Sequence, residues 1–182
     1  MIIEKSAQTR IHAKISALPA EFLERVRSSG FDDLGQPVRR MIARGGEPCR
    51  DVLRRAVAGE KLILCSFTPF TRSGPYKEFG PIFILSHGSG ESVQTDRLAA
   101  GGASDYLRER FVIRAYSHDE EIIDASLVEA AHAQSVINRF SALPNAAFLH
   151  VRFPAYGCFA CRLEVASTDA PDGEKAWTTG GS

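Results

Sequence analysis

The chain has 182 residues, of which 44% are hydrophobic and 24% are charged, as is typical of a globular protein. Its 22 lysines and arginines are balanced by 22 aspartates and glutamates, whereas proteins that bind nucleic acid usually carry a basic excess. The composition therefore argues against nucleic acid as a partner. We expect a single domain over residues 1–166 and a flexible tail over residues 167–182, which are mostly small and polar.

The sequence also argues against a membrane protein. No apolar run approaches the roughly 20 residues needed to span a bilayer, and the opening MIIEKSAQTR lacks the apolar core of a secretory signal. We therefore expect a cytoplasmic protein, whose thiols are usually reduced. Its four cysteines are expected to be core residues, ligands or nucleophiles. The sequence does not predict the oligomeric state.

The N-terminal part predicts a strand and a short helix. Residues 9–15, TRIHAKI, alternate apolar and polar side chains as a strand does. A helix follows in LPAEFLERVRSSG, where Pro19 suits the first turn and Gly30 suits the end. Residues 31–48 are rich in Gly, Pro and Arg and indicate a connector. A short helical turn is expected within it, over residues 38–43.

The middle of the chain predicts strands joined by turns and a loop. Residues 61–67 and 81–85 are apolar on both faces, which is typical of central strands. The segment between them consists of turn-forming residues, and residues 86–104 indicate a long Gly/Ser loop. FVIRAY, residues 111–116, predicts a further strand.

The main helix is expected over residues 127–141. Ser126 and Glu129 have the spacing of a capping box, and the apolar residues after them recur with a helical period. Strands are predicted over 147–153 and 158–165. We therefore expect an α+β fold. It would comprise a mostly antiparallel sheet of about five or six strands, with helix 127–141 packed on it and the shorter N-terminal helix.

The last two strands predict a polar face. The connector PAYG is short, so the strands should form an antiparallel hairpin. Alternation buries Cys161 beside Phe159 and Leu163. On the opposite face of the hairpin, alternation gathers His150, Arg152, Cys158 and Arg162. If the strand FVIRAY pairs nearby, it adds Arg114 and Tyr116 to this face.

Arginines gathered beside a histidine would repel each other unless anions or carboxylates lay among them. The functional interpretation is a site for a carboxylate or phosphate. The alternative is a solvated face whose charge is balanced by Glu164, Asp119 or Glu120. Both interpretations remain open at this point.

The stretch GCFAC, residues 157–161, has the spacing of a metal or redox motif. A zinc site could use Cys49, Cys158 and Cys161, completed by a histidine such as His150. A redox pair is disfavoured because the motif opens a strand rather than a helix. Cys158 or Cys49 could instead be a nucleophile beside His150. The simplest alternative is that Cys161 and Cys65 are core residues.

Several segments in order carry a family resemblance: PCRDVLRRAVAGEKLIL, GPYKEFGPIFI, RAY, IIDASLVE, FLHVR and GCFACRLE. Together they resemble an uncharacterised bacterial family, the domain-of-unknown-function family 1203, from about residue 10 to residue 166. The resemblance implies a grouping but no mechanism, because the family carries no established activity. In some relatives the first cysteine belongs to a C-x-x-C motif, which Val52 interrupts in this chain.

Two hypotheses follow. In the first, the domain binds or transforms a small anionic ligand without a cofactor. Arg50, Arg114, Tyr116, Arg152 and Arg162 would bind the ligand, His150 would act as an acid–base group, and Cys49 or Cys158 would be reactive thiols. In the second, the domain is stabilised by zinc or is purely structural, and it works through protein partners.

Overall fold

The computed structural model describes residues 13–91, 93, 95, 98 and 106–165. Its elements in chain order are β1 (Ala13–Ser16), α1 (Ala20–Ser28), β2 (Arg39–Ile42), β3 (Pro48–Cys49), β4 (Arg54–Arg55), β5 (Lys61–Phe67), β6 (Gly80–Leu85), β7 (Arg110–Tyr116), β8 (Ile122–Glu129), the 3₁₀ turn η1 (Ala130–His132), α2 (Ala133–Ser141), β9 (Phe148–Arg152) and β10 (Phe159–Val165). The predicted tail, residues 167–182, and Ile11 of the predicted first strand lie outside the described residues.

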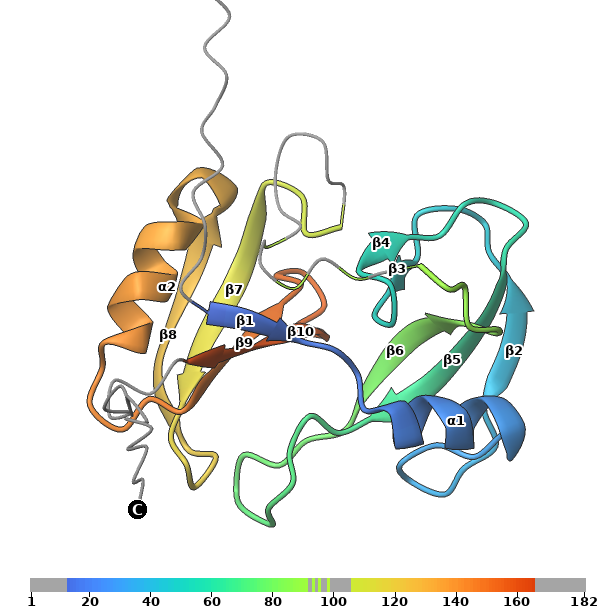
Figure 1. Ribbon diagram of the computed structural model, residues 1–182, viewed down its shortest axis with the longest axis horizontal. Coiled ribbons are helices and arrows are strands. Elements are labelled where there is room, and N and C mark those ends of the chain that lie inside the picture. The colour runs from blue at the N-terminus through green and yellow to red at the C-terminus, as the bar shows by residue number, and fades with distance from the viewer. Residues whose placement is uncertain (1–12, 92, 94, 96–97, 99–105, 166–182) are drawn as a thin grey trace, which may run out of the picture.

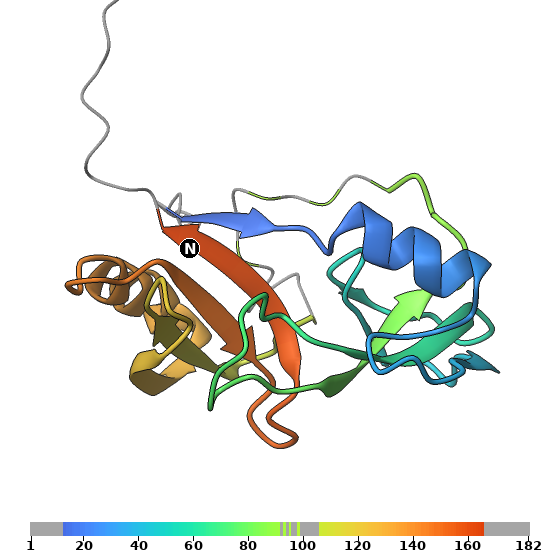
Figure 2. The same cartoon turned by 90° about the horizontal axis from the view of Figure 1, so that it is seen from below.

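The strands form two sheets that lie beside each other (Figure 1). Sheet 1 has the order β1-β10-β9-β7-β8 and is antiparallel. Sheet 2 has the order β2-β5-β6-β3-β4, in which β3 and β6 are parallel and the other pairs are antiparallel. In the chain, all the strands of sheet 2 come after β1 and before β7. In space, β1 pairs with the last strand, β10, at the edge of sheet 1 (Figure 2). The predicted α+β class is confirmed.

The described residues hold ten strands rather than five or six. The additional strands include β2, β3 and β4, which have four, two and two residues and lie in or next to the predicted connector. Strand β2 replaces the helical turn predicted over residues 38–43. It pairs with β5 along its whole length, so its stability comes from a distant neighbour and not from local periodicity.

The prediction of a helix over residues 127–141 is wrong in its first part. Helix α2 begins only at Ala133, and residues 122–129 form strand β8. Ser126, the predicted capping residue, pairs with Ile113 across the sheet. The long pairing of β8 with β7 overrides the local capping pattern, because a sheet neighbour satisfies the backbone that a cap would have satisfied.

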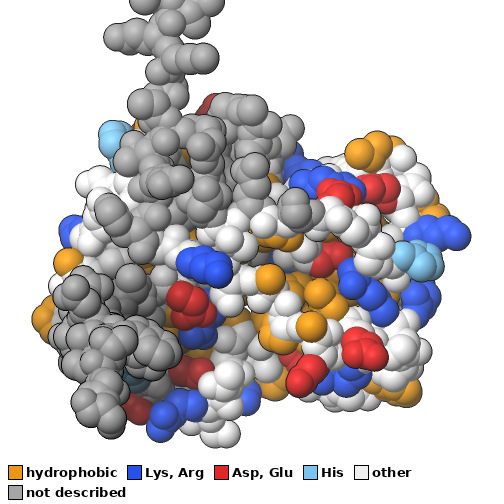
Figure 3. Space-filling view, in the orientation of Figure 1, with side chains coloured by type: hydrophobic (Ala, Val, Ile, Leu, Met, Phe, Trp, Pro, Cys, Tyr) orange, Lys and Arg blue, Asp and Glu red, His pale blue; other side chains and the backbone are white. Residues whose placement is uncertain are grey.

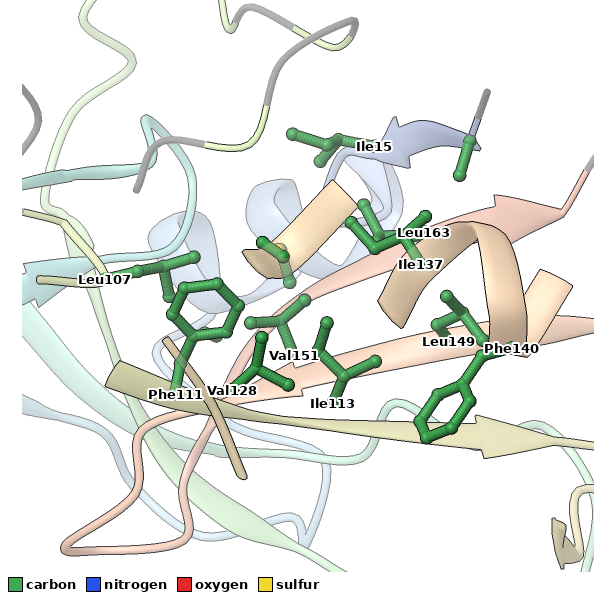
Figure 4. Close-up of a cluster of buried hydrophobic side chains, with 14 of the residues drawn as sticks. Ile15, Leu107, Phe111, Ile113, Val128, Ile137, Phe140, Leu149, Val151 and Leu163 are labelled. Atoms are coloured by element: carbon green, nitrogen blue, oxygen red, sulfur yellow. The ribbon is translucent and has the colours of Figure 1, made fainter. Parts of the chain in front are cut away.

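The two helices cover different sheets. Helix α2 packs Ile137 and Phe140 against one face of sheet 1, in a core that includes Ile113, Leu149 and Val151 (Figure 4). Helix α1 packs Phe22 and Val26 against sheet 2. The face of sheet 1 that α2 leaves uncovered is the face that carries the predicted polar residues. No helix in the described part of the chain is long and apolar enough to cross a bilayer.

A β-bulge changes the faces of strand β10. The register shifts between Phe159 and Cys161, so Phe159 lies opposite Arg152 and leaves the face of Cys161, against the prediction. Its ring contacts Phe67 of sheet 2, with centroids 5.5 Å apart, and belongs to the core beneath α1. Cys161 is buried in the α2 core, as predicted. Phe159 thus joins the two sheets.

Replacement of Phe159 by Ala is expected to lower the free energy of unfolding by about 3–5 kcal/mol, the usual cost of removing a buried ring. Urea denaturation followed by circular dichroism measures this change. Tyr156→Ala is the control, because Tyr156 is 88% exposed and should change stability by less than about 0.5 kcal/mol. Equal effects of the two substitutions would contradict the joining role of Phe159.

Candidate functional site

The register of sheet 1 places Arg162, His150 and Arg114 in one row. Arg162 of β10 and Arg114 of β7 both lie directly opposite His150 of the central strand β9. Residues directly opposite each other share a face of a sheet, and this is the face away from α2. Arg152 and Tyr116 lie on it one row to either side. The structure thus brings together all the predicted ligand-binding residues except Arg50.

His150 lies in an aromatic enclosure. Its side chain is 0% exposed, and four ring centroids lie within 5.2 Å of its own: Tyr116 at 4.6 Å, Phe148 at 5.0 Å, and Phe70 and Phe159 at 5.2 Å. Neither Nδ1 nor Nε2 has a hydrogen-bond partner among the described residues. Most buried side-chain polar atoms have a partner, so this imidazole is an exception that requires an explanation.

Burial lowers the pKa of His150, and the charges of Arg162 and Arg114 lower it further, to about 3. The imidazole is therefore neutral at physiological pH, with one N–H donor and one lone-pair acceptor. A group with this pKa is a weak base near pH 7. The environment consequently favours a hydrogen-bonding role for His150 over the acid–base role expected from the sequence.

The two flanking arginines differ in their surroundings. Arg162 lies over the ring of Phe148, 3.7 Å from its centroid, and its Nε donates to Glu164 at 2.6 Å. Burial raises the pKa of Tyr116, and a hydrogen bond from Arg114 partly offsets this effect. No carboxylate of the described residues forms an ion pair with Arg114. Arg114 therefore offers a charge that no ion pair within the described ranges neutralises.

Arg152 and Arg50 have structural partners. The Nη1 of Arg152 donates to the carbonyl of Gly157 at 2.9 Å, and its Nη2 forms an ion pair with Glu78. Its buried Nε has no hydrogen-bond partner within the described ranges. Arg50 is also buried, but its Nε donates to the carbonyl of Phe159 at 2.9 Å. This places Arg50 beside the joint between the sheets and outside the row that contains His150.

The connection between β5 and β6, residues 68–79, covers the site; we call it the β5–β6 loop. Its Phe70 is buried against His150 and Tyr116. Glu120, in the turn between β7 and β8, accepts hydrogen bonds from the N–H of Thr71 at 2.9 Å, its hydroxyl at 2.8 Å and the N–H of Arg72 at 2.9 Å. Phe70 was not among the residues predicted for the site, and Glu120 was expected only as one of the acidic residues that could balance the charge of the arginines. The only signal in the sequence is an aromatic residue within the turn-forming segment TPFT.

The cysteines do not join His150. Cys49, Cys65 and Cys161 are buried in three separate core clusters, and burial raises the pKa of each to about 12. Cys158 is partly exposed and packs against the core on the α2 side of sheet 1. The expectation that Cys158 and His150 share a face is therefore wrong, because the bulge in β10 places Cys158 on the other side.

The predicted zinc ligands are not brought together. Cys49 lies in a cluster on sheet 2, whereas Cys161 lies in the core of sheet 1. Within the described ranges, no three His, Cys, Asp or Glu side chains form a group that could hold a metal ion. The zinc alternative therefore stays a prediction, and the described residues do not supply a set of ligands for it.

Comparison with known proteins places the chain among proteins whose function has not been established. A family model described as "Protein of unknown function (DUF1203)" matches residues 46–164, a range that includes β3 to β9 and nearly all of β10. No curated protein matches the chain, and no solved structure matches it.

The cysteine environments predict selective thiol labelling. At pH 8 in the folded protein, a thiol reagent such as Ellman's reagent is expected to react rapidly with Cys158 alone, since the other three thiols are buried and neutral. All four should react in denaturant, and Cys158→Ser should remove the fast reaction. Fast labelling of Cys49 in the folded parent would contradict this assignment and revive its role as a nucleophile.

The His150 pKa predicts a pH dependence of stability. Between pH 6.5 and about pH 3 the unfolded state binds a proton at this residue that the folded state does not. The free energy of unfolding should therefore fall by up to about 1.4 kcal/mol per pH unit as the pH drops below 6.5. Urea denaturation at pH 7, 6 and 5 measures this slope.

His150→Phe should lose this contribution, whereas the exposed His118→Gln should keep it. Parallel pH profiles of the parent and His150→Phe would show that His150 is not buried in its neutral form.

Proposed function

The chain belongs to the DUF1203 family of proteins of unknown function, and we propose that it binds a small molecule carrying a carboxylate or a phosphate on the His150 face of sheet 1. The observation that carries the proposal is the imidazole of His150, which is fully buried between Arg114 and Arg162 with both nitrogens unpartnered. Leaving a buried polar group unpartnered costs about 1–3 kcal/mol. Proteins tolerate such costs at functional sites, where a ligand can supply the partner.

The proposed roles follow from the contacts. Arg114 has no carboxylate partner in the part of the chain that the structure describes. It would bind the anion directly, since a guanidinium matches the geometry of carboxylate and phosphate oxygens. Arg162, held by Phe148 and Glu164, would add a second positive charge. The N–H of neutral His150 would donate to the ligand in a site of low dielectric constant, where hydrogen bonds are strong. The hydroxyl of Tyr116 would orient Arg114.

The distribution of charge supports a small ligand rather than a polyanion. Basic and acidic side chains are intermixed over the face seen in Figure 3, and the net charge of the chain is zero. A nucleic acid would need a continuous basic surface, whereas a carboxylate or phosphate group needs only the arginines around His150. Arg152 would shape the site, since Gly157 and Glu78 already hold its guanidinium.

Thermal unfolding with added phosphate or acetate, at constant ionic strength, tests the proposal. An anion at ten times its Kd should stabilise the parent by about 1.4 kcal/mol, which corresponds to a rise in Tm of roughly 3–5 °C for a domain of this size. Arg114→Ala should abolish the rise. Arg39→Ala is the matched control, because Arg39 is an exposed arginine of strand β2 in sheet 2, and it should respond like the parent.

Native mass spectrometry of freshly purified protein provides an independent measurement. A bound organic anion that is present in the parent and in Arg39→Ala, and is lost in Arg114→Ala, would support the site. An identical response of all three proteins to anions, with no bound species in any of them, would reject it.

A further inference from the structure

The enclosure of His150 raises the question of how a ligand reaches it. The side chain is 0% exposed, and Phe70, which covers it, is only 4% exposed. An anion that lies between Arg114 and Arg162 can therefore meet the imidazole only after one of the enclosing rings has moved. Of the four rings around His150, three belong to strands of sheet 1, and Phe70 alone comes from a loop. The β5–β6 loop is therefore the part of the enclosure that can open without breaking a sheet.

The β5–β6 loop is attached to sheet 1 in a way that would allow it to move away from His150. It leaves sheet 2 after β5 and reaches across to the β7–β8 turn of sheet 1 (Figure 1). Residues 71–76, half of the loop, are exposed, so this half has little packing to lose when it moves. Its side chains that are fixed on sheet 1 lie near its two ends. At the first end, Phe70 contacts His150 and the hydroxyl of Thr71 donates to Glu120. Arg72 forms an exposed ion pair with Asp119 of the same turn. At the second end, Glu78 pairs with Arg152.

Glu120 is the main attachment of the first end. It is 8% exposed, and its carboxylate accepts the three hydrogen bonds from Thr71 and Arg72. Its backbone has a φ of +62°, a left-handed conformation that is unfavourable for a non-glycine residue and is often found at functional sites. The protein thus holds a carboxylate in an unfavourable backbone conformation where it can bind the loop.

We infer that the β5–β6 loop is a lid over the proposed anion site and that Glu120 is the positioning residue that holds it closed. The inference rests on the proposed function for its purpose, but the closed and open states differ whether or not an anion binds. Opening exchanges the hydrogen bonds of Glu120 for bonds to water and moves the ring of Phe70 away from His150. When the loop closes after a ligand has bound, the ring of Phe70 packs over the site again and excludes water from the ligand.

Chemical modification of His150 tests the lid without any ligand. The parent, Glu120→Gln and Glu121→Gln are treated briefly with diethyl pyrocarbonate at pH 7, and each histidine is quantified by peptide mass spectrometry. In the parent, His150 should react far more slowly than the exposed His118 and His132. Hydrogen bonds to a charged group contribute about 1.5–3 kcal/mol, so loss of the charge should increase the reaction of His150 roughly 10-fold or more. Glu121→Gln is the control.

Glu121 lies in the same turn and is exposed, and its carboxylate forms no hydrogen bond or ion pair with the described residues. The Glu121→Gln protein should therefore react like the parent. Phe70→Ala is the second variant. It should expose His150 while the hydrogen bonds of Glu120 remain, so it tests the lid even if Glu120→Gln folds poorly.

Alkylation of Cys161 separates opening of the loop from unfolding of the domain. Cys161 is buried in the α2 core on the other side of sheet 1, and it should stay unreactive in both variants. The inference is overturned if His150 reacts equally slowly in the parent, Glu120→Gln and Phe70→Ala, or if Cys161 becomes reactive in step with His150. If the variants show that the loop opens but the Tm of the parent does not respond to anions, the proposed function is refuted while the inference of a lid stands.

Discussion

The packing of Phe159 is the interaction on which the rest of the structure depends. The bulge in β10 removes this ring from the α2 core and places it between the two sheets, against Phe67 on one side and His150 on the other. The buried guanidinium of Arg50 binds the carbonyl of the same residue. One aromatic side chain therefore belongs both to the core of sheet 2 and to the wall of the site. The enclosure of His150 exists only while the two sheets are packed together, so stability of the fold and geometry of the site are coupled.

The part of the site that the sequence predicts correctly is the part that depends on strand alternation. His150, Arg152 and Arg162 share a face because side chains alternate along paired strands, and Arg114 joins them once β7 pairs with β9. The same rule fails at Cys158 and Phe159. A bulge inserts one residue into the alternation and reverses the faces on one side of it, and nothing in GCFAC marks where that residue lies. The bulge is the reason why Cys158 and His150 do not share a face.

Other differences arise wherever distant contacts decide the local structure. Residues 122–129 carry a capping pattern, yet their pairing with β7 makes them a strand. Strands β2, β3 and β4 are too short to show a period and are defined by their neighbours. Phe70 and Glu120 belong to connections, whose sequence indicates a turn but not the surface on which the turn packs. The α+β class was predictable because it depends only on which long segments are helices and which are strands. The loop that covers the site was not, because its position depends on contacts between distant segments.

The burial of His150 has opposite consequences for stability and for binding. A leucine or phenylalanine in the same aromatic enclosure would avoid an unpartnered polar group and would not lose stability below pH 6.5. The enclosure also excludes water, however, and a neutral N–H in a dry site forms a stronger hydrogen bond to an anion than a solvated one does. Arg114 and Arg162 keep the imidazole neutral and attract the same anion. A dry site must also admit its ligand, and the described structure encloses His150 with three rings fixed in sheet 1 and one carried by a loop. The features that cost the folded protein stability are thus the same features that a small anion site closed by a lid requires.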